Sequence, residues 1–448
     1  MPIYTGNATV NSAITSTTLT EMSPQSYQVT NALRNTMRPT LLLPFAQSGT
    51  VDPRITFTRN GQATYFNSAG VLTTATNNVP RIDYNPSTLA CNGLLIEQAS
   101  TNLVYPSIIT SSWNTSGTIT TNATVAPDNT TTGSKLIPNT TIGQWAAWTY
   151  CSTALSTTYT LSCYAKTNGY PRLWLLATDF SGNSFGATFN LSTGVFVSST
   201  TGGVSTYISS TINYGGNGWY RCSITGIPNT SNALATALYV DNGSGNYFTG
   251  DGTSGIQIWG AQLEQTAFPT SYIATTGATA TRAADLATIP LGSWYNTKAS
   301  TILIEAQKNT SADTGYGGVV ELNDNTVNNR LQFYVYPSST TLHWADEYTS
   351  NTTDANLTVG TYTLSTAYRA AGSITGALST SGNISASLNG VTAVTGTTGN
   401  FPGVSFTQMQ IGSLSGGSGA NFMNGWIQRI AYWPIAMTTT QLQAMTSD

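Results

Sequence analysis

Hydrophobic and polar residues alternate in short runs along most of the chain, and turn residues separate these runs. The first runs are residues 55–58 and 63–66, with the hairpin signal Asn60-Gly61 between them. An alternation with a period of two points every second side chain of a strand to the same face. Such runs recur about every 8–12 residues in the denser parts of the chain, which is typical of an antiparallel β-sandwich.

The runs fall into two blocks. The first block contains residues 157–165, 173–177, 187–190, 195–198, 219–224 and 256–263. The second block begins near Asp285, after a stretch rich in Thr, Ala and Gly, and contains residues 301–306, 331–336, 384–388, 408–411 and 425–433. Asn389-Gly390 is a further hairpin signal within it. We therefore predict an all-β fold, with two antiparallel, jelly-roll-like β-sandwiches in series.

Two short segments have helical spacing instead. Ser23-Pro24 has the form of an N-cap followed by proline, and apolar residues from Val29 to Met37 share one face until Arg38-Pro39 ends the segment. A helix this short is marginal alone in water, so it needs a partner in its own chain, in a sister subunit or on a larger particle. Near the C-terminus, Thr438-x-x-Gln441 predicts a capping box at the start of a second helix.

Composition narrows the classes of function. Charged residues make up only 7% of the 448 residues, against roughly 25% in an average soluble domain. Aromatic residues make up 10%, which indicates a folded chain with a neutral polar surface. The 15 Lys and Arg form no run and the net charge is −3, so we expect no nucleic-acid partner. We also expect no membrane insertion and no secretory signal, because no apolar stretch approaches the roughly 20 residues of a membrane span.

The cysteines are Cys91, Cys151, Cys163 and Cys222, and His343 is the only histidine. Without a C-x-x-C pair, this set argues against a zinc site. Two alternatives stay open for the thiols. Cys151 and Cys163 could form a disulfide across a hairpin, or all four could be buried free thiols that pack as small apolar groups.

Several strings resemble recurrent strings of bacteriophage virion structural proteins of the tail-fibre or receptor-binding type. They are residues 52–59 (DPRITFTR), 80–84 (PRIDY), 93–97 (GLLIE), 101–103 (TNL), 259–264 (WGAQLE), 269–273 (PTSYI) and 281–285 (TRAAD). The strings 159–166 (YTLSCYAK) and 218–221 (GWYR) are similar to those of carbohydrate-binding-module-like jelly rolls. The strings 388–391 (LNGV) and 424–434 (NGWIQRIAYWP) resemble concanavalin A-like or laminin-G-like sandwiches.

The resemblance implies a division into residues 1–45, an N-terminal virion-attachment segment, and residues 46–110, linker strands. Residues 111–284 would be the carbohydrate-binding-module-like jelly roll and residues 285–448 the concanavalin A-like sandwich. It also implies a virion protein assembled in the host cytoplasm and exposed on the particle surface. The expected partners are other virion proteins, sister subunits in a homotrimer and a glycan of the host surface. A head fibre or capsid decoration protein is the alternative.

We expect no enzyme. Glycoside hydrolysis needs two carboxyl groups across a cleft, and Glu97 with Glu264 is the best candidate pair. The alternative, which we favour, is that both carboxylates accept structural hydrogen bonds where the linker joins the sandwich. His343 would have to serve any catalytic triad, but it lies in an alternating run without a nucleophile-elbow string.

Sugar binding fits the composition better, because saccharides are held by aromatic faces, amides and hydroxyls. The candidate residues are Trp113, Trp145, Trp148 and Tyr150 in the first sandwich, and Tyr334, Tyr336, Trp344 and Tyr348 in the second. Large aromatic residues also fill cores. Trp145 and Trp148 have odd spacing, so at least one of them should be exposed or at a rim.

Sandwiches of the kinds that this chain resembles often carry a structural calcium ion. Such an ion needs about six to eight oxygen ligands. Asp241, Asn242, Asn246 and Asp251 cluster in a Gly-rich segment and could supply some of them. A hydrated loop without an ion is the alternative, so Asp241 and Asp251 remain candidates for calcium only.

Overall fold

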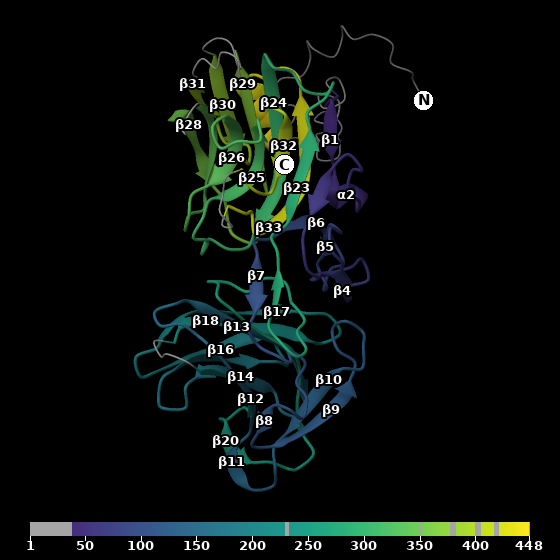
Figure 1. Cartoon of the computed structure of the whole chain (residues 1–448), viewed down its shortest axis with the longest axis vertical. Coiled ribbons are helices and arrows are strands. Elements are labelled where there is room, and N and C mark those ends of the chain that lie inside the picture. Colours follow the sequence, from purple (N-terminus) through teal and green to yellow (C-terminus); the bar gives the residue numbers. More distant parts are fainter. Residues whose placement is uncertain are drawn as a thin grey trace, which may run out of the picture.

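The computed structural model describes residues 38–228, 233–348, 352–376, 382–398, 405–415 and 421–447. The helix expected before Arg38 lies outside these residues. Within them the chain is almost entirely antiparallel β-structure, as predicted, and it forms two bodies stacked along the long axis of the molecule (Figure 1).

The upper body in Figure 1, here called the base sandwich, consists of two packed sheets. The first contains, in spatial order, β31 (Val394–Thr397), β30 (Asn383–Leu388), β29 (Tyr368–Thr375), β24 (Ala299–Lys308), β33 (Gly425–Trp433), β6 (Cys91–Ile96) and β5 (Ile82–Tyr84), with β1 (Leu41–Leu43) also paired to β33. The second contains β2 (Thr56–Thr58), β23 (Leu286–Pro290), β32 (Gln408–Ile411), β25 (Gly317–Asn323), β26 (Arg330–Val335), β27 (Thr341–Tyr348) and β28 (Thr352–Thr361).

The lower body, here called the inserted jelly roll, also has two sheets. One contains β17 (Thr206–Tyr214), β18 (Tyr220–Ile227), β13 (Tyr159–Asn168), β21 (Gly255–Glu264), β10 (Gly133–Ile137) and β9 (Thr118–Thr124). The other contains β16 (Val195–Gly202), β15 (Ser184–Asn190), β14 (Arg172–Thr178), β19 (Leu234–Asp241), β12 (Ala146–Cys151) and β8 (Asn114–Thr115). A short pair, β11 (Ile142–Gln144) with β20 (Tyr247–Thr249), lies at its far end.

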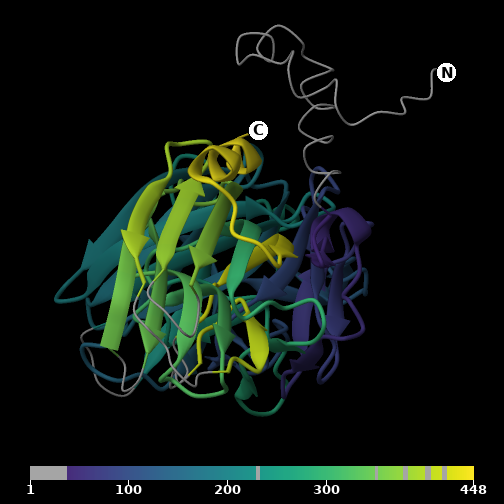
Figure 2. The same cartoon turned by 90° about the horizontal axis from the view of Figure 1, so that it is seen from above.

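The domain boundaries differ from the expected ones. Strands from the supposed linker, residues 46–110, and from the end of the attachment segment belong to the base sandwich together with strands from residues 285–448. Leu41, Phe57 and Ile96 share one hydrophobic core with Ile302 and Trp344. Figure 2 shows these leading strands, in purple, side by side with the green and yellow strands of the same body. Sequence periodicity cannot reveal this, because strand partners are set by tertiary packing.

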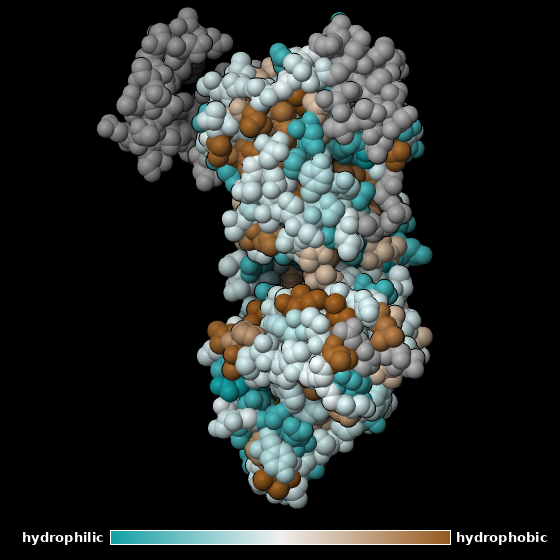
Figure 3. All heavy atoms as spheres, turned by 90° about the vertical axis from the view of Figure 1, so that its left-hand side faces the viewer, coloured by the Kyte–Doolittle hydropathy of each residue, from teal (hydrophilic) through white to brown (hydrophobic). Residues whose placement is uncertain are grey.

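The jelly roll is therefore an insertion within the base sandwich. The chain leaves the base through β7 (Ser100–Asn102) and returns through β22 (Ala280–Arg282). These two strands pair with each other, with Thr101 opposite Thr281. They form a two-stranded neck between the bodies (Figure 1), and Figure 3 shows the waist at this level.

One expected hairpin is wrong. Residues 55–58 and 63–66 do not pair across Asn60-Gly61: β2 pairs with β23, and β3 (Ala63–Phe66) pairs with β4 (Leu72–Ala75). Gly61 does have a positive φ of 93°, but the two strands diverge after the turn. The hairpin signal at Asn389-Gly390 is confirmed, because β30 and β31 pair on either side of it and both turn residues have positive φ.

The structure also tests the predictions for the C-terminal helix and for the cysteines. A short helix, α2 (Phe45–Ser48), follows β1, and α3 (Thr439–Thr446) begins at Thr438 with the predicted capping box to Gln441. The four cysteines are free thiols, and Cys151 and Cys163 do not lie across one hairpin, because β12 and β13 belong to different sheets of the jelly roll.

Five buried charged residues lie where the neck enters the base sandwich, and we call them the junction ion network: Arg59, Arg81, Glu97, Arg282 and Asp285. Asp285 accepts from Arg59 at 3.1 Å and from Arg81 at 2.5 Å, and Glu97 accepts from Arg81 at 2.8 Å and from Arg282. Burial disfavours the charge of Glu97, but the two guanidinium groups and Ser271 outweigh burial and hold the pKa of Glu97 well below its usual value. The carboxylate therefore stays charged at neutral pH.

Gly93 shows how closely the chain packs beside this network. It lies in β6 with a φ of 104°, and a Cβ atom there would lie 2.4 Å from the carbonyl oxygen of Ile427 in β33. Only glycine allows β6 to approach β33 at this point, which explains the glycine of the 93–97 string.

We expect Glu97→Gln to lower the free energy of unfolding by about 3–5 kcal/mol, because it leaves buried guanidinium groups without their carboxylate. Chemical denaturation followed by tryptophan fluorescence measures the change. Arg54→Met is the matched control, since the exposed Arg54–Asp52 pair should contribute no more than about 1 kcal/mol. Similar small losses in both variants would contradict a central role for the network.

Candidate functional site

The outer face of the second jelly-roll sheet carries a cluster of aromatic side chains. We call it the aromatic face, and it consists of Trp148, Tyr150, Trp174, Phe180 and Tyr239. Trp148 and Tyr150 follow one another at a spacing of two on β12, so both point outward from the sheet. The sequence had suggested that Trp145 or Trp148 must leave the core, and Trp148 is the one that does.

Small residues make the floor of this face. Trp148 stands opposite Ala237 of β19, and Trp174 of β14 stands opposite Tyr239. The rings of Trp174 and Tyr239 lie 4.7 Å apart between centroids. Phe180, in the loop after β14, makes edge contacts with Trp148 at 5.8 Å and with Tyr150 at 6.2 Å. The aromatic rings of this face therefore lie next to one another above small residues such as Ala237.

The rings are accessible to different degrees. Tyr150 is 52% exposed and Phe180 is 47% exposed, while Trp148 and Trp174 are half-buried. Rings that are held by neighbours and open on one side can stack on a sugar with little loss of side-chain entropy. Sequence reasoning had named Trp148 and Tyr150 but missed Trp174, Phe180 and Tyr239, because cross-strand register is not visible in the sequence.

Three other candidates for sugar contact are core residues. Trp344 is 0% exposed and packs against Phe333 between the sheets of the base sandwich. Trp113 and Trp145 are buried in the jelly roll, where their indole N–H groups donate to the carbonyls of Pro106 and Phe248. Their burial is incompatible with the predicted contact to a glycan. Tyr348 ends β27, and its side chain lies outside the described part of the chain.

A second aromatic cluster lies on the outer face of the base sandwich. His343 stacks on Tyr334 at 5.4 Å and meets Tyr336 edge-on at 4.6 Å. Its Nδ1 is 3.0 Å from Asn356 Oδ1, and burial lowers the pKa of His343. His343 thus lies on a sheet face, where Tyr334, Tyr336 and Asn356 hold its ring.

The carboxylates considered for catalysis are engaged in structural contacts. Glu97 belongs to the junction ion network. Glu264 is fully buried and accepts from Ser100 Oγ at 2.6 Å and from the Thr270 backbone N–H at 3.1 Å. Both side chains therefore stabilise the joint between neck and jelly roll. This agrees with the alternative that we favoured, in which both carboxylates accept structural hydrogen bonds.

The calcium candidates are also held by protein groups. Asp241 lies 3.9 Å from Arg172 and accepts from the Gly243 N–H, and Asp251 accepts from the Thr253 and Ser254 N–H groups. Side-chain and backbone hydrogen bonds from Ser254 and Thr253 lower the pKa of Asp251. Within the described ranges, no three His, Cys, Asp or Glu side chains gather as metal ligands would.

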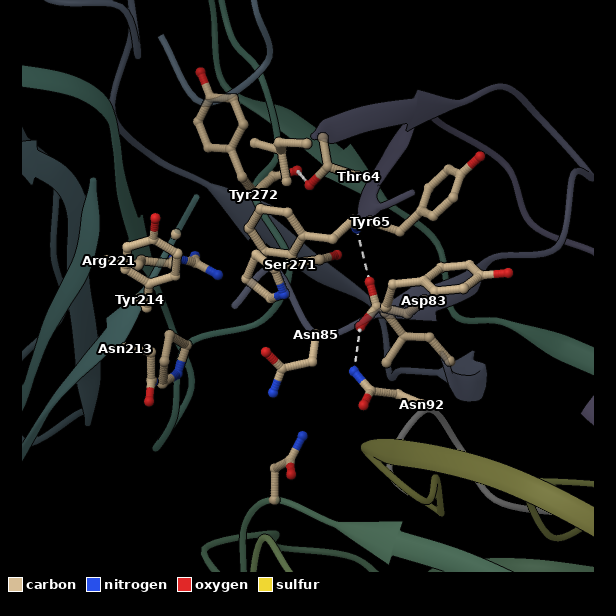
Figure 4. Close-up of a pocket in the computed structure, with 18 of the residues that line it drawn as sticks. Thr64, Tyr65, Asp83, Asn85, Asn92, Asn213, Tyr214, Arg221, Ser271 and Tyr272 are labelled. Carbon is tan, nitrogen blue, oxygen red and sulfur yellow. Dashed lines mark hydrogen bonds between the residues drawn. The ribbon is translucent and has the colours of Figure 1, made fainter. Parts of the chain in front are cut away.

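A cavity of about 380 Å³ lies where the jelly roll, the β3–β4 hairpin and the base sandwich meet (Figure 4). Its volume falls within the roughly 300–1,000 Å³ of typical ligand pockets. Its lining contains the charged residues Asp83, Glu97 and Arg221. It is also rich in aromatic rings, amides and hydroxyls: Thr64, Tyr65, Phe66, Tyr84, Asn85, Asn92, Tyr164, Asn213, Tyr214, Ser271, Tyr272, Asn309 and Trp426. We call it the junction cavity. No sequence signal could have located it, since these residues come from distant segments.

Asp83 anchors one wall of the cavity. Its Oδ1 accepts from the Phe66 N–H at 2.7 Å, and its Oδ2 accepts from Asn92 at 3.3 Å and from the Trp426 indole at 2.9 Å. Burial outweighs these donors and raises the pKa of Asp83 from 3.8 to about 6. One carboxylate therefore ties the β3–β4 hairpin to both β6 and β33.

The similarity of this chain to known proteins is confined to distant solved structures. No protein-family model matches it, and no curated protein matches it. Among solved structures, a CBM40 module of a Ruminococcus gnavus sialidase bound to α2,3-sialyllactose is 13% identical, covering 34% of this chain and 84% of its own, with a TM-score of 0.29. A Trypanosoma rangeli sialidase is 8% identical (71% and 54% covered, TM-score 0.28), and mouse laminin α1 LG4-5 is 9% identical (77% and 96% covered, TM-score 0.21).

Scores of this size carry no functional argument, so the proposals below rest on this chain's own residues. Among the helices of the described residues, none is long and apolar enough to cross a membrane.

We expect Asp83→Asn to change how stability depends on pH. Because the pKa of Asp83 is about 6 in the folded chain and 3.8 in the unfolded reference, the folded state binds more protons between these values. The wild type should therefore lose about 3 kcal/mol relative to the variant as the pH rises from about 4 to above 6. Urea denaturation at several pH values measures this difference, and parallel profiles for both proteins would refute it.

Proposed function

We propose that this chain is a bacteriophage virion structural protein of the tail-fibre or spike type, which attaches the particle to a glycan of the host surface. One observation supports this most directly. Four of the strings that resemble phage structural proteins, which are far apart in the sequence, contribute to the junction ion network: Arg59, Arg81, Glu97, and Arg282 with Asp285. Residues that build one joint together support a common origin for the strings.

The proposed contact with the glycan is the aromatic face of the jelly roll. Stacking on neutral rings suits a chain in which only 7% of the residues are charged. Figure 3 shows one side of the molecule with a mostly pale surface of intermediate hydropathy and scattered hydrophobic patches. The small share of charged residues limits unspecific ionic binding in the medium between particle and host.

The proposal excludes catalysis and includes a homotrimer exposed on the particle. Glu97 and Glu264, the best candidates for a catalytic pair, are both buried in structural contacts. β16 and β17 are edge strands of the two jelly-roll sheets, and residues 180–214 contain no charged residue. Exposed Phe196, Val204 and Ile208 lie along these edges. Uncharged edges of this kind favour burial between subunits.

The first test concerns the glycan. We expect the double variant Trp148→Ala with Tyr150→Ala to bind host surface polysaccharides at least about tenfold more weakly than the wild type, because it removes two stacking rings. Binding to an array of bacterial surface polysaccharides measures the loss. Tyr247→Ala is the matched control, since Tyr247 is 65% exposed but lies on β20 away from this face. An equal loss in the control would count against the aromatic face.

The second test concerns the particle. We expect a density map of the intact virion to place three copies on a tail fibre or spike, and deletion of residues 1–37 to abolish incorporation. The deletion must stop before Leu41 and Leu43, which belong to the base core. A map that places the chain on the head selects the alternative, a head fibre or decoration protein. Normal incorporation of the deleted chain would refute attachment through this segment.

A further inference from the structure

Arg221 differs from the other arginines in its electrostatic partners. From Arg54 onward, every arginine except Arg221 forms an ion pair with a carboxylate of the described residues. A guanidinium group without a carboxylate is unusual in a chain with so few charges. Arg221 belongs to the 218–221 string. No residue of this string is part of the aromatic face, so that face does not explain the string.

The contacts of Arg221 leave most of its donors unused. Its Nη2 donates to Ser162 Oγ at 3.1 Å, and its guanidinium lies 5.7 Å from the ring centroid of Tyr164. A guanidinium group has five N–H donors arranged to match a carboxylate. Figure 4 shows these nitrogens directed toward the space between Ser271 and Asn85, which is the junction cavity.

The other charges around the cavity do not neutralise Arg221. Glu97 is matched by Arg81 and Arg282, and the junction ion network holds three guanidinium groups against two carboxylates. Asp83, on the opposite wall, adds a third carboxylate, and both of its oxygens already accept hydrogen bonds from protein donors. With Arg221 included, four guanidinium groups stand against three carboxylates around the cavity, and Arg221 keeps free donors, which favours an anion.

The rest of the lining suits sugar hydroxyl groups. Asn85, Asn213 and Asn309 supply amides, which both donate and accept hydrogen bonds, and Tyr214 offers a ring that is 39% exposed. A simple inorganic anion would not use this combination of amides and rings. An acidic sugar would use both the charge and the polar lining.

We propose that the junction cavity binds a saccharide that carries a carboxylate, with Arg221 as the bidentate partner of that carboxylate. The site is separate from the aromatic face and rests on the proposed function only in that the ligand is a glycan. It adds a preference for acidic glycans at the joint between the two bodies.

Titration calorimetry of the full chain with methyl β-D-glucuronide and methyl β-D-glucoside tests the proposal. We expect the wild type to bind the glucuronide at least about tenfold more tightly than the glucoside, because only the former can form charge-assisted hydrogen bonds with Arg221. Arg221→Gln should remove this preference. Asn213→Trp, which fills the cavity from an exposed position, should block both sugars without disturbing the core.

Controls separate this site from others. Arg172→Gln changes an arginine that is paired with Asp241 on the other sheet, and it should leave the preference intact. The double variant at Trp148 and Tyr150 should also keep it, even if binding to the polysaccharide array is lost. A folded wild type that binds neither sugar, or both equally, overturns the proposal. So does a preference that survives Arg221→Gln, or inorganic phosphate that binds as tightly as the glucuronide.

Discussion

The pairing of buried charges where the neck enters the base sandwich is the constraint on which the rest of the architecture depends. Charges removed from water are costly unless each finds its partner, so the network accepts one arrangement of the surrounding backbone. Its five members lie next to the ends of β2, β5 and β6 and at the return of the neck. By fixing these segments together, the network sets the position of the β3–β4 hairpin on the jelly roll and thereby shapes the junction cavity. Packing of Phe66 and Leu72 against Tyr164 and Tyr272 completes the joint.

The sequence predicts local structure well because alternation, turn residues and caps act over a few positions. Most strands of both blocks, the turn at Asn389-Gly390 and the helix after Thr438 form where expected. It does not predict pairing between distant segments. That is why the leading strands were assigned to a linker, and why Ala63–Phe66 was paired with the wrong strand.

The same difference between local patterns and long-range pairing applies to the candidate sites. Odd spacing correctly indicated that Trp145 and Trp148 could not share an environment, yet spacing alone could not tell that Trp344 packs in a core. Trp174, Phe180 and Tyr239 join the aromatic face through cross-strand register, which a single chain does not reveal. Nothing in the sequence singles out Arg221. What distinguishes it is that, among the described residues, it has no carboxylate partner in the folded chain.

The two-stranded neck has a mechanical consequence. A pull on the jelly roll reaches the base through two covalent backbones at once, β7 and β22, which run side by side between the bodies. Tension along the long axis loads both strands in the same direction, so the hydrogen bonds between them are not sheared. The ion pair between Glu97, which precedes β7, and Arg282, the last residue of β22, links the two chains where they meet the base. A domain held in this way transmits force to the base without first separating the two strands that carry it.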